Sequence, residues 1–192
     1  MEHPIRVACV GDSITEGACG QPYPAQLQDM LGEWYLVGNF GSFGAHLRIS
    51  GSPYSYTRTP QYAASLAWRP DVVLFSLGTN DRLEEDAPFL AEYFRRDLET
   101  MVGRYRALPC APLVIGALSP AVHRGGDNGE IVRDRICPMQ RETFAALDVP
   151  VVDLFALTQP RPDWFADGLH PNSEGYRQIA RAFCDALHAA GR

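Results

Sequence analysis

The sequence predicts an α/β fold in which a five-stranded parallel β-sheet is covered by helices on both faces, a three-layer α/β/α sandwich. First, apolar runs of strand length alternate along the chain with longer segments of helical period, as in parallel sheets with helical connections. Second, the short runs are rich in Val, Ile, Leu and Phe and carry few charges, which is typical of strands buried on both sides. Because no repeat or linker interrupts the alternation, we expect residues 1–192 to form a single domain.

The expected elements follow one another in register. Strands are predicted at residues 5–10, 35–40, 72–77, 113–118 and 151–154, each a dense apolar run. Helices are predicted at residues 23–31, 61–67, 88–107, 131–147 and 173–190. The third helix shows the clearest amphipathic pattern, with Leu90, Phe94 and Leu98 on one face and Arg95 and Glu99 on the other.

The composition excludes several classes of function. All 17 basic residues are Arg and none is Lys, so the chain cannot form a lysine Schiff base, a P-loop or a Ser-x-x-Lys nucleophile. The net charge is -6 and no window concentrates Arg into a basic stripe, so a nucleic-acid partner is not expected.

Patterns of secreted, membrane and metal-binding proteins are also missing from the sequence. The first residues lack a basic segment followed by a long apolar one, and no apolar stretch is long enough to cross a bilayer. The five cysteines are an odd number without a CxxC pair, and no His or carboxylate cluster has metal-ligand spacing. We therefore expect a cytoplasmic protein with reduced thiols that uses no metal and no cofactor and does not bind a membrane.

Chemically unusual residues follow the predicted strands. In sheets of this kind, ligands bind beyond the carboxyl ends of the strands. The residues there are Gly11-Asp12-Ser13 after the first strand, Gly41-Ser42-Phe43-Gly44 after the second, Gly78-Thr79-Asn80-Asp81 after the third and, after the fifth and a short connection, Asp167-Gly168-Leu169-His170-Pro171. We expect these four segments to meet at one edge of the sheet.

Their side chains suggest nucleophilic acyl transfer, in which a His takes the proton of a Ser and a carboxylate fixes the His tautomer. Ser13 is the candidate nucleophile. The three-residue spacing of Asp167 and His170 allows the carboxylate to reach one ring nitrogen while the other points elsewhere. Gly44 and Asn80 can supply the hydrogen-bond donors that a developing oxyanion needs, and Gly44 also permits a close backbone approach.

Asp12 and Asp81 have a different expected role. Each lies in a turn beside a candidate functional residue, so either carboxylate could be mistaken for a catalytic partner. Asp side chains in turns commonly accept backbone N–H bonds. We therefore expect Asp12 and Asp81 to hold their turns.

The four segments resemble motifs of the SGNH, or GDSL-type, hydrolase family. The matching motifs are Gly11-Asp12-Ser13, Asn39-x-Gly41-x-x-Gly44, Gly78-x-Asn80-Asp81 and Asp167-x-x-His170-Pro171, in the family's order. The resemblance implies a flavodoxin-like three-layer fold, with Ser13 as nucleophile, His170 as general base and Asp167 orienting His170. It further implies an oxyanion hole formed by the Ser13 N–H, the Gly44 N–H and the Asn80 side chain.

A competing interpretation is the α/β-hydrolase fold, whose triad also follows the order Ser, Asp, His. Its nucleophile elbow reads Gly-x-Ser-x-Gly, however, and Thr15 stands where the second glycine belongs. The sequence therefore favours the SGNH family.

The segment from Arg48 to Arg58 is the candidate wall of the active site. It is rich in Ser, Gly and Tyr, and long loops without regular structure are often functional. Arg48, Tyr54 and Arg58 suit a polar, ring-shaped alcohol such as a sugar, and the two arginines could recognise an anionic one. Trp164 could close a small acyl pocket.

The expected function is that of a serine esterase acting on a small acylated substrate. The sequence also resembles, more loosely, the carbohydrate acetylesterases of the family, including sialate O-acetylesterase-like and acetylxylan esterase-like members. This resemblance implies hydrolysis of short-chain acyl esters, above all O-acetyl groups on a sugar. Two alternatives stay open: a broad-specificity arylesterase, thioesterase or short-chain lipase, and a non-enzymatic α/β domain that binds sugars.

Overall fold

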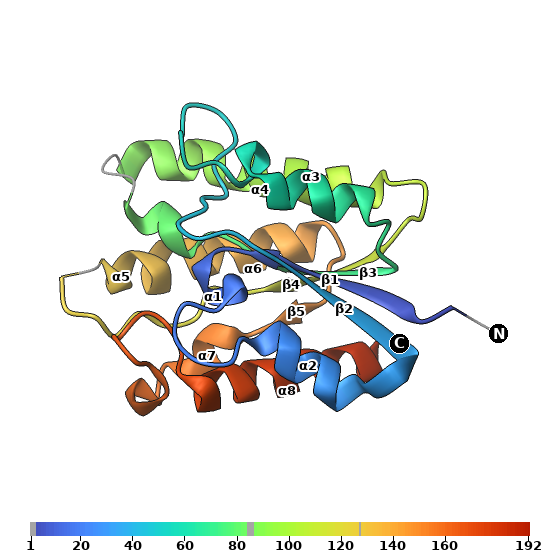
Figure 1. Ribbon diagram of the computed structural model, residues 1–192. Helices are drawn as coiled ribbons and strands as arrows, with labels where there is room; N and C mark the ends of the chain where they lie inside the picture. Colours follow the sequence, from blue (N-terminus) through green and yellow to red (C-terminus); the bar gives the residue numbers. More distant parts are fainter. Residues whose placement is uncertain (1–2, 84–86, 127) are drawn as a thin grey trace.

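A five-stranded parallel sheet forms the centre of the molecule (Figure 1). The computed structural model describes residues 3–83, 87–126 and 128–192. The strand order is β2-β1-β3-β4-β5, and every neighbouring pair is parallel. The strands are β1 (Ile5–Gly11), β2 (Tyr35–Gly41), β3 (Val72–Ser76), β4 (Leu113–Ala117) and β5 (Val151–Val152). The predicted three-layer fold with a five-stranded parallel sheet is confirmed.

Helices cover both faces of the sheet (Figure 1). One face carries α3 (Pro60–Ala67), α4 (Ala87–Arg106) and α6 (Cys137–Ala146); the other carries α2 (Tyr23–Leu31), α7 (Leu154–Thr158) and α8 (Ser173–Ala189). Shorter elements are α1 (Ser13–Glu16), α5 (Gly129–Ile131), the π-helix η4 (Val132–Ile136) and the 3₁₀ helices η1 (Gly32–Trp34), η2 (Tyr56–Arg58), η3 (Thr79–Leu83) and η5 (Pro162–Trp164).

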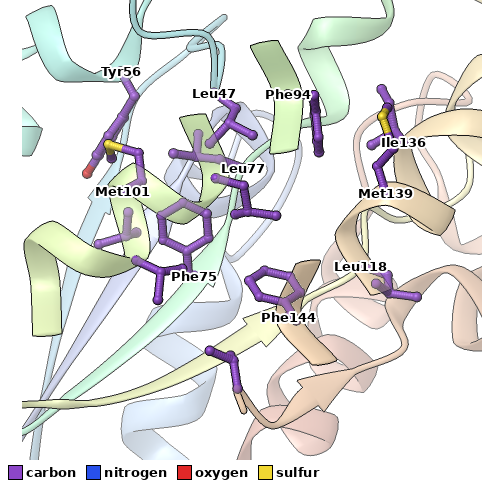
Figure 2. Packing of buried hydrophobic residues seen from close by; sticks show 14 of the residues in the cluster. Leu47, Tyr56, Phe75, Leu77, Phe94, Met101, Leu118, Ile136, Met139 and Phe144 are labelled. Atoms are coloured by element: carbon purple, nitrogen blue, oxygen red, sulfur yellow. The ribbon is translucent and has the colours of Figure 1, made fainter. Parts of the chain in front are cut away.

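Side chains of the central strand β3 alternate between two apolar cores, as the period of a strand requires. Val73 and Phe75 face the helices α4 and α6, and Val72 and Leu74 face the helices α2 and α8. Phe75 packs edge-on against Phe144 of α6, with ring centroids 6.4 Å apart (Figure 2). Because both faces of β3 are buried, its first four residues, 72–75, are all apolar.

Two predicted elements differ from the observed ones by more than one residue at a boundary. Residue 154 begins helix α7 instead of ending a strand, because the Asp153 side chain accepts the N–H of Ala156 at 2.8 Å and caps that helix. The helix predicted at residues 131–147 is interrupted by the π-helix η4, which ends at Ile136, two residues before Pro138. Proline lacks an N–H and its ring clashes with the carbonyl four residues earlier, so a wider turn forms there.

The segment from Arg48 to Arg58 is more ordered than predicted. It contains the 3₁₀ helix η2, and a β-bridge joins His46 to Ser55. Backbone bonds of 2.9 Å connect His46 with Tyr54 and with Tyr56, so the segment is a closed loop.

Along the described ranges, no helix is both long and apolar enough to cross a membrane.

Candidate active site

Ser13 lies in a tight turn at the carboxyl end of β1. The Asp12 side chain accepts the Ile14 N–H at 2.9 Å and so caps the short helix α1, which begins at Ser13. The turn can pack closely because Gly11 and Gly41 lack side chains: a Cβ atom at Gly11 would collide with the Thr15 side chain, and one at Gly41 with the backbone of Glu16. The turn therefore holds Ser13 tightly against the ends of β1 and β2.

Ser13, His170 and Asp167 form a continuous chain of hydrogen bonds. The Ser13 Oγ atom is 3.0 Å from His170 Nε2, and His170 Nδ1 is 2.9 Å from Asp167 Oδ2. The Ser13 and His170 residues are only 4% and 7% exposed, so both are largely buried. The structure thus brings together the three residues that the sequence singled out as nucleophile, base and orienter.

Asp167 stays ionised over the whole ordinary pH range. Partial burial acts to raise its pKa, but hydrogen bonds from the backbone and ring of His170 and from the Leu169 N–H outweigh it and lower the pKa to about 2. A carboxylate can only accept a hydrogen bond, so the proton between the two groups belongs to His170 Nδ1. In the neutral ring Nε2 is then an acceptor directed at Ser13.

The turn that carries Asp167 and His170 is closed by its own backbone. A β-bridge joins Phe165 to Pro171, and the Ala166 N–H donates to the His170 carbonyl at 2.9 Å. The Gly168 carbonyl accepts the His123 N–H at 2.7 Å, which ties the turn to the loop that follows β4.

Gly44 and Asn80 lie side by side at the ends of β2 and β3. The Asn80 Nδ2 atom donates to the carbonyl of Ala45, the neighbour of Gly44, at 3.1 Å. Gly44 has φ +69°, a backbone conformation that favours glycine. A Cβ there would meet no atom within 4 Å among the described residues, so the requirement that the structure shows at Gly44 is conformational. The close approach of a substrate to this backbone stays a prediction.

Asp81 anchors the loop that carries Gly44. Its carboxylate accepts the Leu47 N–H at 2.8 Å, the Arg48 N–H at 3.0 Å and the Tyr93 hydroxyl at 3.2 Å. Burial raises the pKa of Asp81 to about 6, and the nearby His46 and these hydrogen bonds act in the opposite direction. Asp81 therefore holds the backbone of the loop that follows Gly44, and it does not line the cavity that opens in front of Gly44 and Asn80.

A cavity of about 490 Å³ opens in front of Gly44 and Asn80. Its walls are mostly apolar or uncharged, and they come from the loop after β2, from the 46–55 loop and from η3: Phe43, Gly44, His46, Gly51, Ser52, Pro53, Tyr54, Asn80 and Leu83. The Phe43 ring also stacks against His170, with centroids 6.0 Å apart. Phe43 therefore links the cavity wall to His170 of the hydrogen-bonded chain.

Of the four residues predicted to bind substrate, the structure brings only Tyr54 to this cavity. The Arg48 guanidinium lies over the Tyr93 ring at 4.9 Å and donates to the Ser50 carbonyl. Arg58 is exposed at the end of η2 and does not line the cavity. Trp164 is buried, with the Arg161 guanidinium 4.2 Å from the centre of its ring, and it does not line the cavity.

Sequence reasoning missed three residues at this site. Phe43 and Leu83 are exposed apolar side chains in loops, and neither belongs to a periodic pattern. Arg82 is buried beside Asn80, although an arginine after a turn is normally solvated. Phe43 directly precedes Gly44, and Arg82 directly follows Asn80-Asp81. This adjacency in the sequence is the signal that could have identified both residues as part of the site.

The arrangement has the parts needed for acyl transfer: an oxygen nucleophile, an acceptor nitrogen directed at it, a carboxylate that fixes the ring, and an amide and a backbone segment beside a cavity. These parts come from the carboxyl ends of β1, β2 and β3 and from the turn before α8.

Comparison with known proteins agrees with this arrangement. Residues 9–178 match the GDSL-like lipase/acylhydrolase family. An acetylxylan esterase from Xylanibacter ruminicola is 33% identical over 214 aligned positions, which cover 97% of this chain. The chain spans 44% of the length of that relative.

Solved structures share the fold at low sequence identity. A lipase/acylhydrolase from Enterococcus faecalis superimposes with a TM-score of 0.76 at 22% identity, covering 97% of this chain and 96% of its own. A carbohydrate acetylesterase from Sinorhizobium meliloti gives a TM-score of 0.74 at 19% identity, covering 97% and 99%.

Proposed function

Because the chain belongs to the GDSL-like lipase/acylhydrolase family, we propose that it is a serine esterase that hydrolyses short-chain acyl esters through Ser13, His170 and Asp167. The observation that carries the proposal is the hydrogen-bonded chain of 3.0 Å and 2.9 Å from Ser13 through His170 to Asp167, beside a cavity that contains Gly44 and Asn80.

The first half-reaction transfers the acyl group to the enzyme. His170 Nε2 takes the proton of Ser13 as the Oγ atom bonds to the acyl carbon, and a tetrahedral intermediate forms. Asp167 holds the ring and stabilises its positive charge. When the intermediate collapses, the ester C–O bond breaks, His170 protonates the departing alcohol, and the acyl group stays on Ser13. Water, deprotonated by His170, then releases the acid by the same steps.

The oxyanion of each intermediate would be bound by the Ser13 N–H, the Gly44 N–H and the Asn80 amide. An amide NH₂ group carries two N–H bonds, and one of those on Asn80 is used by the Ala45 carbonyl. The other has no acceptor among the described residues and would donate to the substrate oxygen. Such preorganised donors are commonly the largest single contribution to catalysis.

We propose an O-acetylated carbohydrate as the substrate class. The acetylxylan esterase relative supports this, and the cavity is wide enough for a small acyl group together with part of a sugar ring. The aromatic wall residues Phe43 and Tyr54 are suited to stacking on the apolar face of a pyranose. Because Arg48 packs on Tyr93 and Arg58 lies outside the cavity, a neutral sugar fits these walls better than an anionic one.

A second candidate is a small-acyl arylesterase, thioesterase or short-chain lipase. The apolar side chains of Phe43, Pro53 and Leu83 in the cavity wall favour an aromatic or alkyl group as well as a sugar. A sugar-binding domain without catalysis is less well supported, because binding alone does not require His170 Nε2 to face Ser13 Oγ.

The test is hydrolysis of p-nitrophenyl acetate by the wild type and by Ser13→Ala. The serine mechanism predicts a fall in kcat of at least about 10³-fold, and equal rates would exclude it. Acetyl, butyryl and octanoyl esters should be hydrolysed in that order of preference, and a preference for octanoyl would exclude an acetylesterase. Acetylated xylo-oligosaccharides should be better substrates than acetylated sialic acid.

A further inference from the structure

We propose that Arg82 is a positioning residue that fixes the orientation of the Asn80 amide and thereby builds the oxyanion hole. The inference rests on the proposed function, because Asn80 has this role only if the chain is an esterase. Arg82 is 2% exposed and is the one buried arginine in the part of the chain that the structure describes.

Arg82 is bound on the side of Asn80 that faces away from Ala45. Its NH1 group donates to the Thr79 carbonyl at 2.8 Å and to the Asn80 Oδ1 atom at 3.2 Å. At the other end of the same amide, Nδ2 donates to the Ala45 carbonyl at 3.1 Å. The amide of Asn80 is therefore held between a group that only donates and a group that only accepts.

This pairing determines which way the amide points. If the amide were rotated by 180°, the NH₂ group would face the guanidinium and the oxygen would face the Ala45 carbonyl, so both hydrogen bonds would be lost and both contacts would be repulsive. A guanidinium does not lose its proton in proteins, so it fixes the amide at every working pH. Arg82 thus keeps the Nδ2 group on the side of Gly44, where the oxyanion would bind.

The charge of Arg82 has a second effect at the same place. The carboxylate of Asp12, directly before Ser13, is buried, and its Oδ2 atom has no hydrogen-bond partner within the described structure. Burial raises the pKa of Asp12 to about 6, whereas the Ile14 N–H and the charge of Arg82 act to lower it. The positive charge of Arg82 therefore also acts on the buried carboxylate beside Ser13.

The test is a double-mutant cycle between Arg82→Met and Asn80→Ala, measured with p-nitrophenyl acetate. Removing one oxyanion donor typically costs about 10²- to 10³-fold in kcat, so Arg82→Met should lower kcat by roughly 10- to 100-fold and change KM less than about twofold. In the Asn80→Ala background the same substitution should lower kcat by less than about threefold, because no amide remains to be oriented. An equal loss in both backgrounds would overturn the proposal.

A matched control is Arg106→Met. Arg106 also donates to main-chain carbonyls, those of Leu147 and Asp148, but it lies at the end of α4 distant from Ser13. Its kcat should equal that of the wild type.

Arg82→Lys keeps a charged donor, so its kcat should lie between those of the wild type and Arg82→Met. If Arg82→Met does not fold, the cycle is run with Arg82→Lys and judged by the same criterion. The two proposals fail separately: a fully active Ser13→Ala excludes the serine mechanism, whereas an inactive Ser13→Ala with additive losses in the cycle overturns only the role of Arg82.

Discussion

The ring of Phe43 stacks on the imidazole of His170, with centroids 6.0 Å apart and planes inclined by 25°. Phe43 is nevertheless 69% exposed and also lines the cavity in front of Gly44. One side chain thus covers a face of the proposed base and forms part of the wall that a substrate would touch.

Replacing Phe43 with Ala should lower kcat/KM for acetyl esters by roughly three- to tenfold, because an apolar contact worth about 1 kcal/mol is removed from the bound substrate. The stability of the fold should change little, since the ring is mostly exposed. Trp34→Ala is the control: Trp34 is 68% exposed at the opposite, amino end of β2. Steady-state kinetics of both variants check the prediction, and equal values for them would contradict it.

Gly44→Ala should lower kcat by roughly 10- to 100-fold, because alanine resists φ +69° and the N–H proposed for the oxyanion would move. Gly32 offers a control at another glycine with positive φ: its φ is +71° and its ψ -161°, and a Cβ there also meets no atom within 4 Å. Both variants should be less stable than the wild type in urea, because an L side chain resists a positive φ, but only Gly44→Ala should lose activity. A full rate in Gly44→Ala would count against its N–H as an oxyanion donor.

Asp167→Asn should lower kcat by roughly 10³- to 10⁴-fold, because an amide can donate to Nδ1 and stabilise the wrong tautomer of His170. Asp163→Asn is the control, since Asp163 lies in the neighbouring 3₁₀ helix η5 and pairs with Arg161 on the surface. Kinetics at saturating substrate measure the effect. A loss below tenfold would mean that Asp167 does not orient the base.

Asp81→Asn should change the pH dependence of stability. The pKa of Asp81 is raised from 3.8 to about 6 by burial, so the folded state binds this proton more tightly than the unfolded state. The linked stability is fully present below about pH 4 and is lost as the pH rises through 6. The unfolding free energy of the wild type minus that of Asp81→Asn should therefore fall between pH 4 and 7. Urea titrations at several pH values measure it, and a constant difference would refute the raised pKa.

The fold could be predicted because buried parallel strands leave a clear pattern. Residues 72–75, for instance, are apolar on both faces, and strand β3 (Val72–Ser76) matches the predicted strand within one residue. The end of the strand predicted at residues 151–154 could not be placed, because a side-chain cap at Asp153 decides it and the residues there remain apolar.

The candidate site could be predicted in its centre but not in its walls. Ser13, Asn80 and His170 follow from the rule that strand ends meet at one edge, together with the spacing of polar residues. The positions of Arg58 and Trp164 depend on how the loops pack, and no local pattern records that packing. Leu83 and Phe43 were overlooked for the same reason.

The glycine pair at the ends of β1 and β2 has a consequence for enzyme engineering. Gly11 and Gly41 are partners in the strand register, and a methyl group on either would push against the backbone or side chains of the Ser13 turn. A mutant library aimed at new ester substrates should therefore leave these two positions unchanged. Phe43, Tyr54 and Leu83 are exposed and line the cavity, so diversity placed there should alter substrate range while Ser13, the proposed nucleophile, keeps its place.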